Sequence, residues 1–502
     1  MSDALREQLA LLPEYLGRHL LLTITALVIG IGISFPLAII VTRIRWLRGP
    51  VLAIASAIQT IPSLALLALM VPLLGAIGFL PAVIALTLYS MLPVIRNTVT
   101  GIDDVDPDLI EAGRGLGMTP GQLLVKVQIP LAMPVIIAGI RTATVWVVGI
   151  ATLSTPVGAT SLGNFIFSGL QTQNYTAVIV GCVAAAVLAL VLDLLIRLME
   201  VASSRRSRAL LIMALAGVVL VLGGGLAPVL LARGGVDDRP AVVIGAKTFS
   251  EQYILASLIS ERLDATGYRT RRLESLGSTV VFDALVAGRI DCYVDYTGTI
   301  WANHMNREDR ASADDVLRDV TAWLRNEHGI ACLGRLGFEN TYALAMRRDE
   351  AERLGIASID DLFRHASGMK IGGDYEFFGR PEWDRLVSEY ELEFTDTVGM
   401  DGTLMYSAVA TGEIDIIAAF STDGRIAAND LVVLDDPRSV FPPYDAVLLL
   451  GATAAEDVNL RTALQALIGA IDDESMRSAN MEVDVQGASV DTVARRLHET
   501  IR

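Results

Sequence analysis

The segment Leu20–Val41 is LLLTITALVIGIGISFPLAIIV, an apolar run without a single charge. A transmembrane helix needs about 20 consecutive apolar residues to cross the hydrocarbon core of a bilayer. Five further runs of this kind follow before residue 232. We therefore expect an all-α transmembrane domain with six helices, at residues 20–42, 51–74, 79–98, 131–153, 177–198 and 209–231.

The second half of the chain has a different composition, mixed and acidic. Over all 502 residues the apolar fraction is 52% and the mean hydropathy is +0.50, which averages a very apolar half and an ordinary soluble half. A Gly-containing linker at 232–240 separates them. We predict a transmembrane domain at 1–235 and a soluble domain at 236–502. The net charge of −16 argues against nucleic acid as a partner, because phosphates bind basic surfaces.

The basic residues of the first half predict how the chain is oriented in the membrane. They lie in every second loop, whereas the loops 75–78 and 154–175 carry no Lys or Arg. Basic loops face the cytoplasm, so we expect the N-terminus and residues 236–502 on the other side of the cell (cytoplasmic) membrane. No cleavable signal peptide is apparent, because the first apolar run is long enough to remain as a helix. The basic residues are Arg43, Arg45, Arg48, Arg96, Arg114, Lys126, Arg197, Arg205, Arg206 and Arg208.

The loop 101–128 is long and polar, and its helix signals indicate a helix–turn–helix. Asp106-Pro107-Asp108 is a start signal for one helix and Thr119-Pro120-Gly121 for another. Such a pair on the cytoplasmic face fits a docking element for a soluble partner, and it equally fits a plain amphipathic connector.

A family resemblance bears on this choice. Glu111-Ala112-Gly113, Gly117 and Val127-Gln128-Ile129-Pro130 resemble the EAA motif of ABC importer permeases, with Gly113 in place of the second alanine. The resemblance implies that residues 101–130 contact an ABC ATPase subunit, through Glu111, Ala112, Gly113, Gly117 and Pro130. It also implies a second copy of the permease, as a homodimer.

The nucleotide is expected elsewhere. The chain contains no Gly-x-x-x-x-Gly-Lys-Ser/Thr phosphate loop, so we expect no cofactor in this chain and ATP only through the partner ATPase. Within the apolar runs, Arg141 and Asp193 are costly in lipid, and they fit either a pore role or a structural ion pair.

Strand-like and helix-like segments alternate from residue 241 onward, which predicts an α/β domain with largely parallel sheets. A helix is expected at 250–265. About 260 residues suggest two lobes, as in periplasmic binding proteins, with a ligand in the crevice between them. Strands are expected at 241–244, 290–294, 341–345, 370–372, 414–419, 432–434 and 446–450.

Six motifs resemble the substrate-binding proteins of osmoprotectant uptake, which hold glycine betaine, carnitine or choline. Quaternary ammonium groups cannot donate hydrogen bonds, and aromatic faces attract them. The resemblance places Tyr296, Tyr342 and Tyr444 in an aromatic cage, with Phe420 where tyrosine is usual. The motifs are residues 244–252, 295–299, 339–343, 374–380, 420–425 and 442–445.

A carboxylate on the ligand needs cations or donors. Arg380 can bind it in a bidentate manner, and Glu376 can orient Arg380 from one helical turn away. The resemblance adds Lys247 and Thr299 as carboxylate contacts. In the choline-restricted members that this domain resembles, an acidic residue takes the position of Thr299. The threonine here therefore favours a zwitterionic ligand over choline.

Other aromatic residues and the cysteines of the soluble half are expected to have structural roles. We assign Trp301, Tyr375 and Trp383 to packing, although Tyr375 could tune the site for a larger ligand. Cys292 and Cys332 are expected as buried thiols, with a disulfide as the alternative.

These features together predict a permease with a tethered substrate-binding subunit, part of an ATP-driven importer for a small quaternary-ammonium compound and not itself an enzyme. A glycine betaine-type osmoprotectant comes first, and ergothioneine, choline and carnitine are the alternatives. Fused chains of this layout resemble ergothioneine importers. A membrane-anchored ligand sensor is the alternative of another class, against which the EAA-type loop argues.

Overall fold

The computed structural model describes residues 3–172, 174–232, 241–307 and 309–501. The chain forms two compact units, one of Met1–Phe167 and Thr176–Asp237 and the other of Ser168–Tyr175 and Asp238–Arg502. The predicted domain boundary between residues 235 and 236 lies outside the described residues. Each unit is described separately below.

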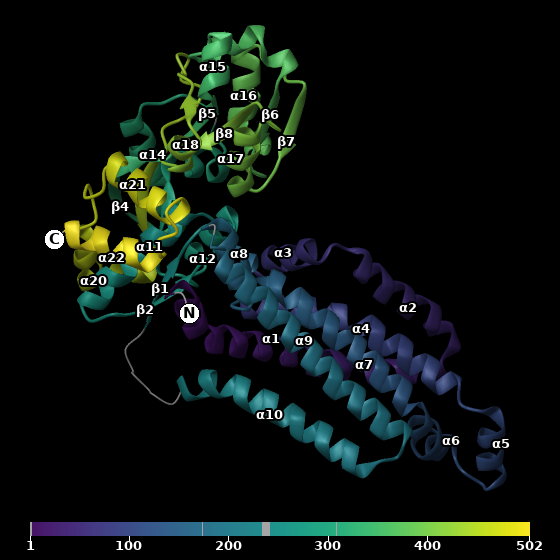
Figure 1. Cartoon of the computed structure of the whole chain (residues 1–502). Coiled ribbons are helices and arrows are strands. Elements are labelled where there is room, and N and C mark those ends of the chain that lie inside the picture. The colour runs from purple at the N-terminus through teal and green to yellow at the C-terminus, as the bar shows by residue number, and fades with distance from the viewer. Residues whose placement is uncertain (1–2, 173, 233–240, 308, 502) are drawn as a thin grey trace. The chain divides into compact units, whose positions relative to one another are not determined.

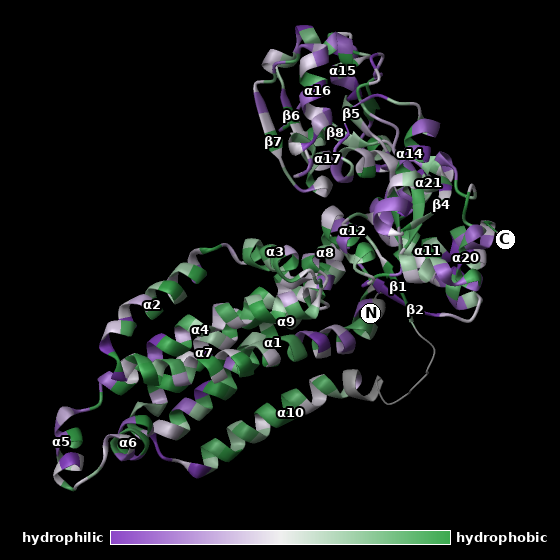
Figure 2. Ribbon diagram, turned by 180° about the vertical axis from the view of Figure 1, so that it is seen from behind, coloured by the Kyte–Doolittle hydropathy of each residue, from purple (hydrophilic) through white to green (hydrophobic). Residues whose placement is uncertain are grey.

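The first unit is helical, and its long helices are hydrophobic over most of their length (Figures 1 and 2). Five of them are long and apolar enough to cross a membrane, which agrees with five of the six predicted spans. These are α1 (Asp3–Arg43), α4 (Phe79–Asp103), α7 (Ile129–Ala151), α9 (Tyr175–Ser204) and α10 (Arg208–Ala232).

The predicted second span, 51–74, is not one straight helix. It is divided into α2 (Arg45–Thr60) and α3 (Ser63–Leu74), which are bent by 100°. Pro62 stands at this break, and proline both lacks an N–H and clashes with the preceding turn of a helix. The predicted span is therefore present as two bent helices, with the break beside a proline.

The bent pair nevertheless carries the chain from one end of α4 to the other. Arg48, near the start of α2, forms an ion pair with Asp103 at the last residue of α4. Gly78, just before α4, donates its N–H to the carbonyl of Val157 at 2.7 Å. With the pair counted as one crossing, the first unit has six.

Glycine permits close contact between α4 and α7. A Cβ on Gly139 would lie 2.8 Å from the carbonyl oxygen of Pro93 and 2.6 Å from the Cβ of Asn97. Backbone cannot yield at such distances without a shift of the helix. By contrast, a Cβ on Gly149, in the same helix, meets nothing within 4 Å.

The two ionisable residues within the predicted apolar runs form a structural pair. Arg141 of α7 lies 3.5 Å from Asp193 and 3.0 Å from Glu200, both in α9. An arginine with two carboxylates satisfies charges that would be costly alone in lipid. Glu200 was not anticipated as the second partner.

The loop between α4 and α7 folds as the predicted helix–turn–helix. In α5 (Pro107–Gly115), Asp106 caps the first turn by accepting from the N–H of Asp108 at 2.9 Å. In α6 (Pro120–Leu123), Thr119 forms a capping box with Gln122. The turn between them needs Gly117, whose φ of +78° disfavours other residues.

Three short elements complete the described part of this half of the chain. A π-helical turn, η1 (Leu124–Gln128), joins α6 to α7, and the 3₁₀ segment η2 (Thr152–Val157) follows α7. The helix α8 (Gly163–Gln171) precedes α9.

The second unit has two lobes, each built on a five-stranded sheet (Figure 1). The chain passes between the lobes at residues 340–341 and 434–444. In the first lobe the strand order is β2 (Arg269–Leu273), β1 (Ala241–Gly245), β3 (Cys292–Tyr296), β10 (Asp445–Leu450), β4 (Ala331–Glu339). In the second lobe it is β7 (Asp396–Gly399), β6 (Lys370–Gly373), β8 (Ile416–Phe420), β5 (Tyr342–Arg347), β9 (Leu431–Val433).

The prediction of largely parallel sheets was wrong. Four strand pairings are parallel and four are antiparallel. Every antiparallel pairing involves β5 or β10, the first strand after each passage between the lobes. Each of these strands enters its sheet in the direction opposite to its neighbours.

Helices cover both sheets, and α11 (Ser250–Ala265) has the predicted bounds. The remaining helices of the first lobe are α12 (Ser278–Val286), α13 (Thr297–Thr299), α14 (Ala313–His328), α19 (Ala452–Glu456), α20 (Val458–Gln465), α21 (Asp473–Asp484) and α22 (Val490–Thr500). Those of the second lobe are α15 (Arg348–Leu354), α16 (Pro381–Tyr390), α17 (Gly402–Thr411) and α18 (Arg425–Ala428).

We predict that Gly139→Ala lowers the thermal stability of the protein in detergent, because the added methyl group separates α4 from α7. Overpacking of this kind costs about 1–3 kcal/mol. Gly149→Ala is the matched control, and it should be neutral or slightly stabilising, since alanine favours a helix over glycine. Size-exclusion chromatography after graded heating measures both variants. Equal midpoints for the two would contradict the close contact.

Candidate ligand-binding site

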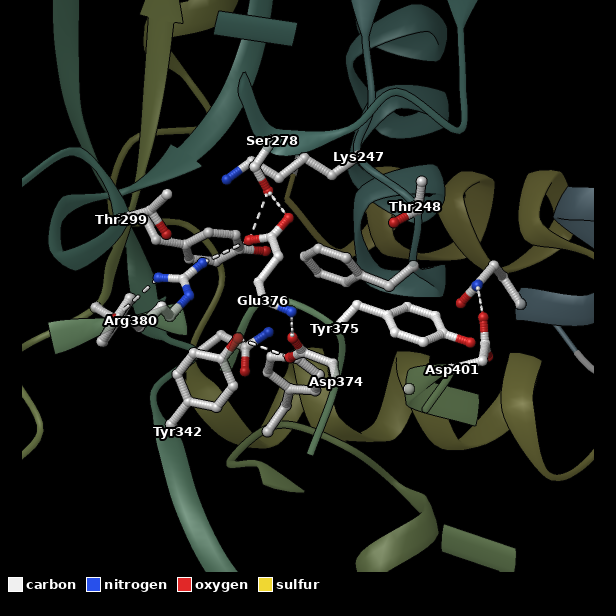
Figure 3. A pocket seen from close by; sticks show the side chains of 17 residues that line it. Lys247, Thr248, Ser278, Thr299, Tyr342, Asp374, Tyr375, Glu376, Arg380 and Asp401 are labelled. Atoms are coloured by element: carbon white, nitrogen blue, oxygen red, sulfur yellow. Dashed lines mark hydrogen bonds and ion pairs between the residues drawn. The ribbon is translucent and has the colours of Figure 1, made fainter. Parts of the chain in front are cut away.

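The cleft between the two lobes of the second unit contains a cavity at the ends of several strands (Figure 3). Residues 247–249 follow β1, Tyr296 ends β3 and Phe420 ends β8. Strand ends of the two sheets meet at this crevice, where α/β folds bind ligands. All eight residues predicted for ligand binding line the cavity: Lys247, Tyr296, Thr299, Tyr342, Glu376, Arg380, Phe420 and Tyr444.

Five of the aromatic rings that line the cavity form one connected group. The ring of Tyr342 lies 5.1 Å from that of Phe420 and 6.1 Å, edge-on, from that of Tyr444. Phe249 joins the group, with its ring 6.0 Å from Phe420 and 6.1 Å from Tyr296. Phe249 was not predicted as a site residue, although it lies within the first quoted motif.

The hydroxyl of each tyrosine in the group donates to a buried or partly buried carboxylate. Tyr296 donates to Glu251 at 2.5 Å, and Tyr342 donates to Asp374 at 2.7 Å. Tyr444 donates to Glu382. Burial, together with these neighbouring carboxylates, raises the pKa of all three tyrosines well above the ordinary value, so they remain neutral donors.

Phe420 lacks such an anchor, and packing holds it instead. It lies between Phe249 and Tyr342, and its backbone N–H donates to the hydroxyl of Tyr406 at 3.1 Å. The aromatic face is retained without the hydroxyl.

Both cationic side chains of the cavity are paired with carboxylates. Lys247, 3% exposed, forms an ion pair with the fully buried Asp295. Arg380, 6% exposed, forms an ion pair with Glu376 at 2.8 Å, and its guanidinium lies 5.2 Å from the ring centre of Tyr342 (Figure 3). Glu376 thus pairs with Arg380, as the sequence predicted.

The electrostatics of Glu376 follow from these cations. Burial acts to raise its pKa, but attraction to Arg380 and Lys247 outweighs burial, and the net pKa is lowered. Ser278 adds a hydrogen bond to the same carboxylate at 3.0 Å. Glu376 is therefore ionised and holds Arg380 in place.

The packing assignments made from the sequence have mixed outcomes. Trp301 is buried and Trp383 packs against Phe378, as expected. Tyr375 was wrongly assigned to packing, because it is 77% exposed and lines the cavity. The sequence analysis also missed Gln171, Thr248, Ser278, Asn340, Asp374, Asp401 and Gly402 in the lining.

Cys292 and Cys332 are free thiols, and so is Cys182. Burial raises the pKa of the Cys292 and Cys332 thiols, which keeps them protonated.

Comparison with known proteins assigns both halves. The family described as the substrate binding domain of ABC-type glycine betaine transport systems matches residues 240–499. The family described as the inner membrane component of binding-protein-dependent transport systems matches residues 30–209. The chain is an ABC importer permease fused to its substrate-binding domain.

Relatives of this importer subunit include one with the same fused layout. The ergothioneine transport permease/ergothioneine binding protein EgtU of Helicobacter pylori is 31% identical over 90% of this chain and 84% of its own length. The choline transport permease OpuBB of Bacillus subtilis is 43% identical over 36% of this chain and 83% of its own length. The crystal structure of a glycine betaine/carnitine/choline ABC transporter protein, 26% identical, covers 52% of this chain and all of its own, with a TM-score of 0.46.

We predict that Asp295→Asn strongly destabilises the substrate-binding domain of the importer subunit. The substitution leaves the Lys247 charge buried without a counter-charge, which costs about 3 kcal/mol or more. For a domain of this size, this corresponds to a melting temperature lower by on the order of 10 °C.

Asp315→Asn is the matched control, since Asp315 pairs with the exposed Arg318 and such surface pairs contribute little. Trp46 and Trp146 of the membrane half are replaced by phenylalanine in all samples, so that the intrinsic fluorescence of Trp301, Trp323 and Trp383 during heating of the full chain in detergent reports the melting of this domain. An Asp295→Asn variant that melts together with Asp315→Asn would contradict the buried pair.

Proposed function

We propose that this subunit captures a small zwitterion with a quaternary ammonium group and passes it through the membrane. The observation that carries the proposal is the connected group of rings around one cavity, in which each tyrosine is hydrogen-bonded to a carboxylate. A quaternary cation offers no N–H, and aromatic faces attract it by about 0.5–2 kcal/mol each. Glu251 and Glu382 add negative potential behind two of the rings without lining the cavity, whereas Asp374 behind Tyr342 also lines it.

The other end of the ligand is proposed to carry a carboxylate. Arg380 keeps a buried Nε–H without a protein acceptor, although Glu376 and Tyr444 occupy its terminal nitrogens. Burying an unpaired donor is costly unless a ligand completes it. Thr299 and Lys247 lie in the same lining and would supply further donors. This arrangement favours a betaine over choline, which has no carboxylate.

Glycine betaine is the first candidate ligand. Two observations support ergothioneine, a larger betaine, as the second candidate. The relative that spans most of this chain is named for ergothioneine. In addition, the exposed Tyr375 and the partly buried Asp401 extend the lining on the side away from Arg380 and Thr299, which leaves room for a longer ligand (Figure 3). Choline and carnitine remain alternatives.

The loop between α4 and α7, with residues 101–130, is proposed to dock an ABC ATPase subunit, through which ATP acts. Glu111, Ala112 and Pro130 are exposed there, and Leu116 is 80% exposed, an unusual position for leucine unless a partner covers it. Gly113 is buried against Leu123, where a Cβ would lie 3.1 Å from a methyl carbon. This close contact accounts for glycine in place of the second alanine of the motif.

The number of crossings and the distribution of basic residues support a proposal for the assembly and its location. One chain supplies only one set of crossings, so a second copy of the permease is proposed to complete the pore. The distribution of basic residues supports placement in the cytoplasmic membrane with residues 236–502 outside the cytoplasm.

Calorimetric titration tests the ligand assignment on the full chain in lipid nanodiscs, with glycine betaine, proline betaine, carnitine, choline and ergothioneine. We expect tight binding of one zwitterion and weak binding of choline. Arg380→Gln should weaken the zwitterion by roughly 10–100-fold, since a charge-assisted hydrogen bond contributes about 1.5–3 kcal/mol. It should leave choline almost unaffected.

Arg353→Gln, which alters an exposed arginine paired with Glu350, is the control and should bind as the unmodified chain does. Choline bound as tightly as the betaines, with Arg380→Gln silent, would remove the carboxylate contact. Absence of binding by all five would contradict a quaternary-ammonium ligand.

A further inference from the structure

A buried carboxylate without a cationic partner lies directly behind the cage. Glu251, the second residue of α11, is 2% exposed. Among the described residues of the substrate-binding domain, no Lys, Arg or His forms an ion pair with it. Isolated buried anions are costly, so this carboxylate must be stabilised by other means.

Four side-chain donors provide that stabilisation, two on each oxygen. Oε1 accepts from the hydroxyl of Tyr296 at 2.5 Å and from the amide of Asn340 at 2.9 Å. Oε2 accepts from the hydroxyl of Thr422 at 2.6 Å and from the amide of Asn480 at 2.9 Å.

The four donors belong to both lobes and to a segment that connects them. Tyr296 and Asn480 belong to the first lobe, at the end of β3 and in α21. Asn340 lies in the passage between β4 and β5, and Thr422 follows β8 in the second lobe. A single carboxylate therefore bonds a cage ring, a connecting segment and both lobes.

Neighbouring contacts fasten the same region. The backbone N–H of Ser421 donates to the carbonyl of Thr341 at 3.0 Å, and the N–H of Thr341 donates to the Ser421 hydroxyl at 3.0 Å. Gly424 packs against Met481 of α21, where a Cβ would lie 2.5 Å from the Met481 Cα. The loop after β8 is thus seated against the first lobe beside Glu251.

The hydrogen-bond pattern favours the ionised form. The two asparagine amide nitrogens can only donate, so the O–H of a protonated carboxyl group could be accepted only by the hydroxyl of Tyr296 or of Thr422. Burial raises the pKa of Glu251, and the bonds from Thr422, Tyr296, Asn480 and Asn340 oppose this only in part, so that its net pKa is raised. With the carboxylate ionised, its negative charge reaches the Tyr296 ring through the hydroxyl, which suits a cation on the ring face.

We propose that Glu251 is a positioning residue that sets the Tyr296 face of the cage and the angle between the lobes through one carboxylate. The link to ligand capture rests on the proposed function of the cavity, whereas the link to the hinge does not. Opening the cleft moves Thr422 away from α11 and breaks the bond to Oε2. Capture and closure thereby share one buried charge.

Glu251→Gln tests this proposal because it keeps the shape and removes the charge. In either orientation the new amide nitrogen takes the place of an oxygen that accepted from one hydroxyl and one asparagine nitrogen. That asparagine nitrogen then loses its acceptor on residue 251. Pulsed electron–electron resonance on the full chain in nanodiscs measures the separation of spin labels at Glu327→Cys in the first lobe and Glu352→Cys in the second. Cys182 and Cys332 are replaced by alanine in all samples.

Without ligand, we expect Glu251→Gln to broaden the distance distribution at least about twofold, and Thr422→Val to do the same. Thr422→Val removes only the donor from the second lobe, and it serves if Glu251→Gln does not fold. Glu274→Gln is the matched control, because Glu274 is a half-buried carboxylate in the first lobe that pairs with Arg272. A merely structural role would broaden none of the distributions, and unchanged widths in Glu251→Gln or Thr422→Val would overturn the proposal.

Glycine betaine and ergothioneine are then titrated into the same samples. We expect the ligand that binds the unmodified chain to bind Glu251→Gln at least tenfold more weakly, and Tyr296→Phe to weaken binding without broadening the distribution. Equal affinity in Glu251→Gln and the unmodified chain would overturn the link to the cage. Failure of both ligands to bind the unmodified chain would instead contradict the proposed function, and the ligand-free distances would still decide the role at the hinge.

Discussion

The binding cleft depends on one type of interaction, the hydrogen bond from a buried tyrosine hydroxyl to a carboxylate. Tyr296, Tyr342 and Tyr444 each have one. The bond fixes the ring and satisfies the hydroxyl, and it places negative charge behind an aromatic face. Because the carboxylates come from α11, from the segment after β6 and from α16, the rings cannot be reoriented without disturbing both lobes. A cavity with this potential suits a cation that has no hydrogen to donate.

In the membrane half, the comparable constraint is that polar groups must be satisfied within the protein. Arg141 meets two carboxylates of α9, and close contact at Gly139 brings α4 and α7 together. The bend at Pro62 interrupts one crossing, yet the chain still reaches the far end of α4. The helix–turn–helix of α5 and α6 follows the same helix, with its caps formed by its own side chains.

Much of this architecture could be predicted from the sequence because its signals are local. Apolar runs locate the membrane helices, and α11 has the predicted bounds. The motifs led to eight residues that line one cavity. Three strands were missed for a physical reason. β2 is RTRRL, a polar edge strand with no apolar alternation, and β4 and β7 contain glycine or mostly exposed residues.

Contacts between distant segments could not be predicted. Lys247 meets Asp295 because β1 and β3 are neighbours in the sheet, which only the topology decides. The contact of Phe249 with the cage rings and the antiparallel direction of β5 and β10 also depend on the topology. Tyr375 was misassigned because an aromatic residue carries no signal for its own exposure. Local chemistry thus identified the site residues, while tertiary structure decided their partners.

The most direct measurement compares glycine betaine with 3,3-dimethylbutyrate, in which carbon replaces the quaternary nitrogen at the same size and shape. Competition binding to the full chain in nanodiscs gives both affinities. If several aromatic faces hold the cation, the analogue, whose tert-butyl group is uncharged, should bind at least about 100-fold more weakly, since each face contributes about 0.5–2 kcal/mol. Equal affinities would show that the cavity selects shape and not charge, and they would contradict the account.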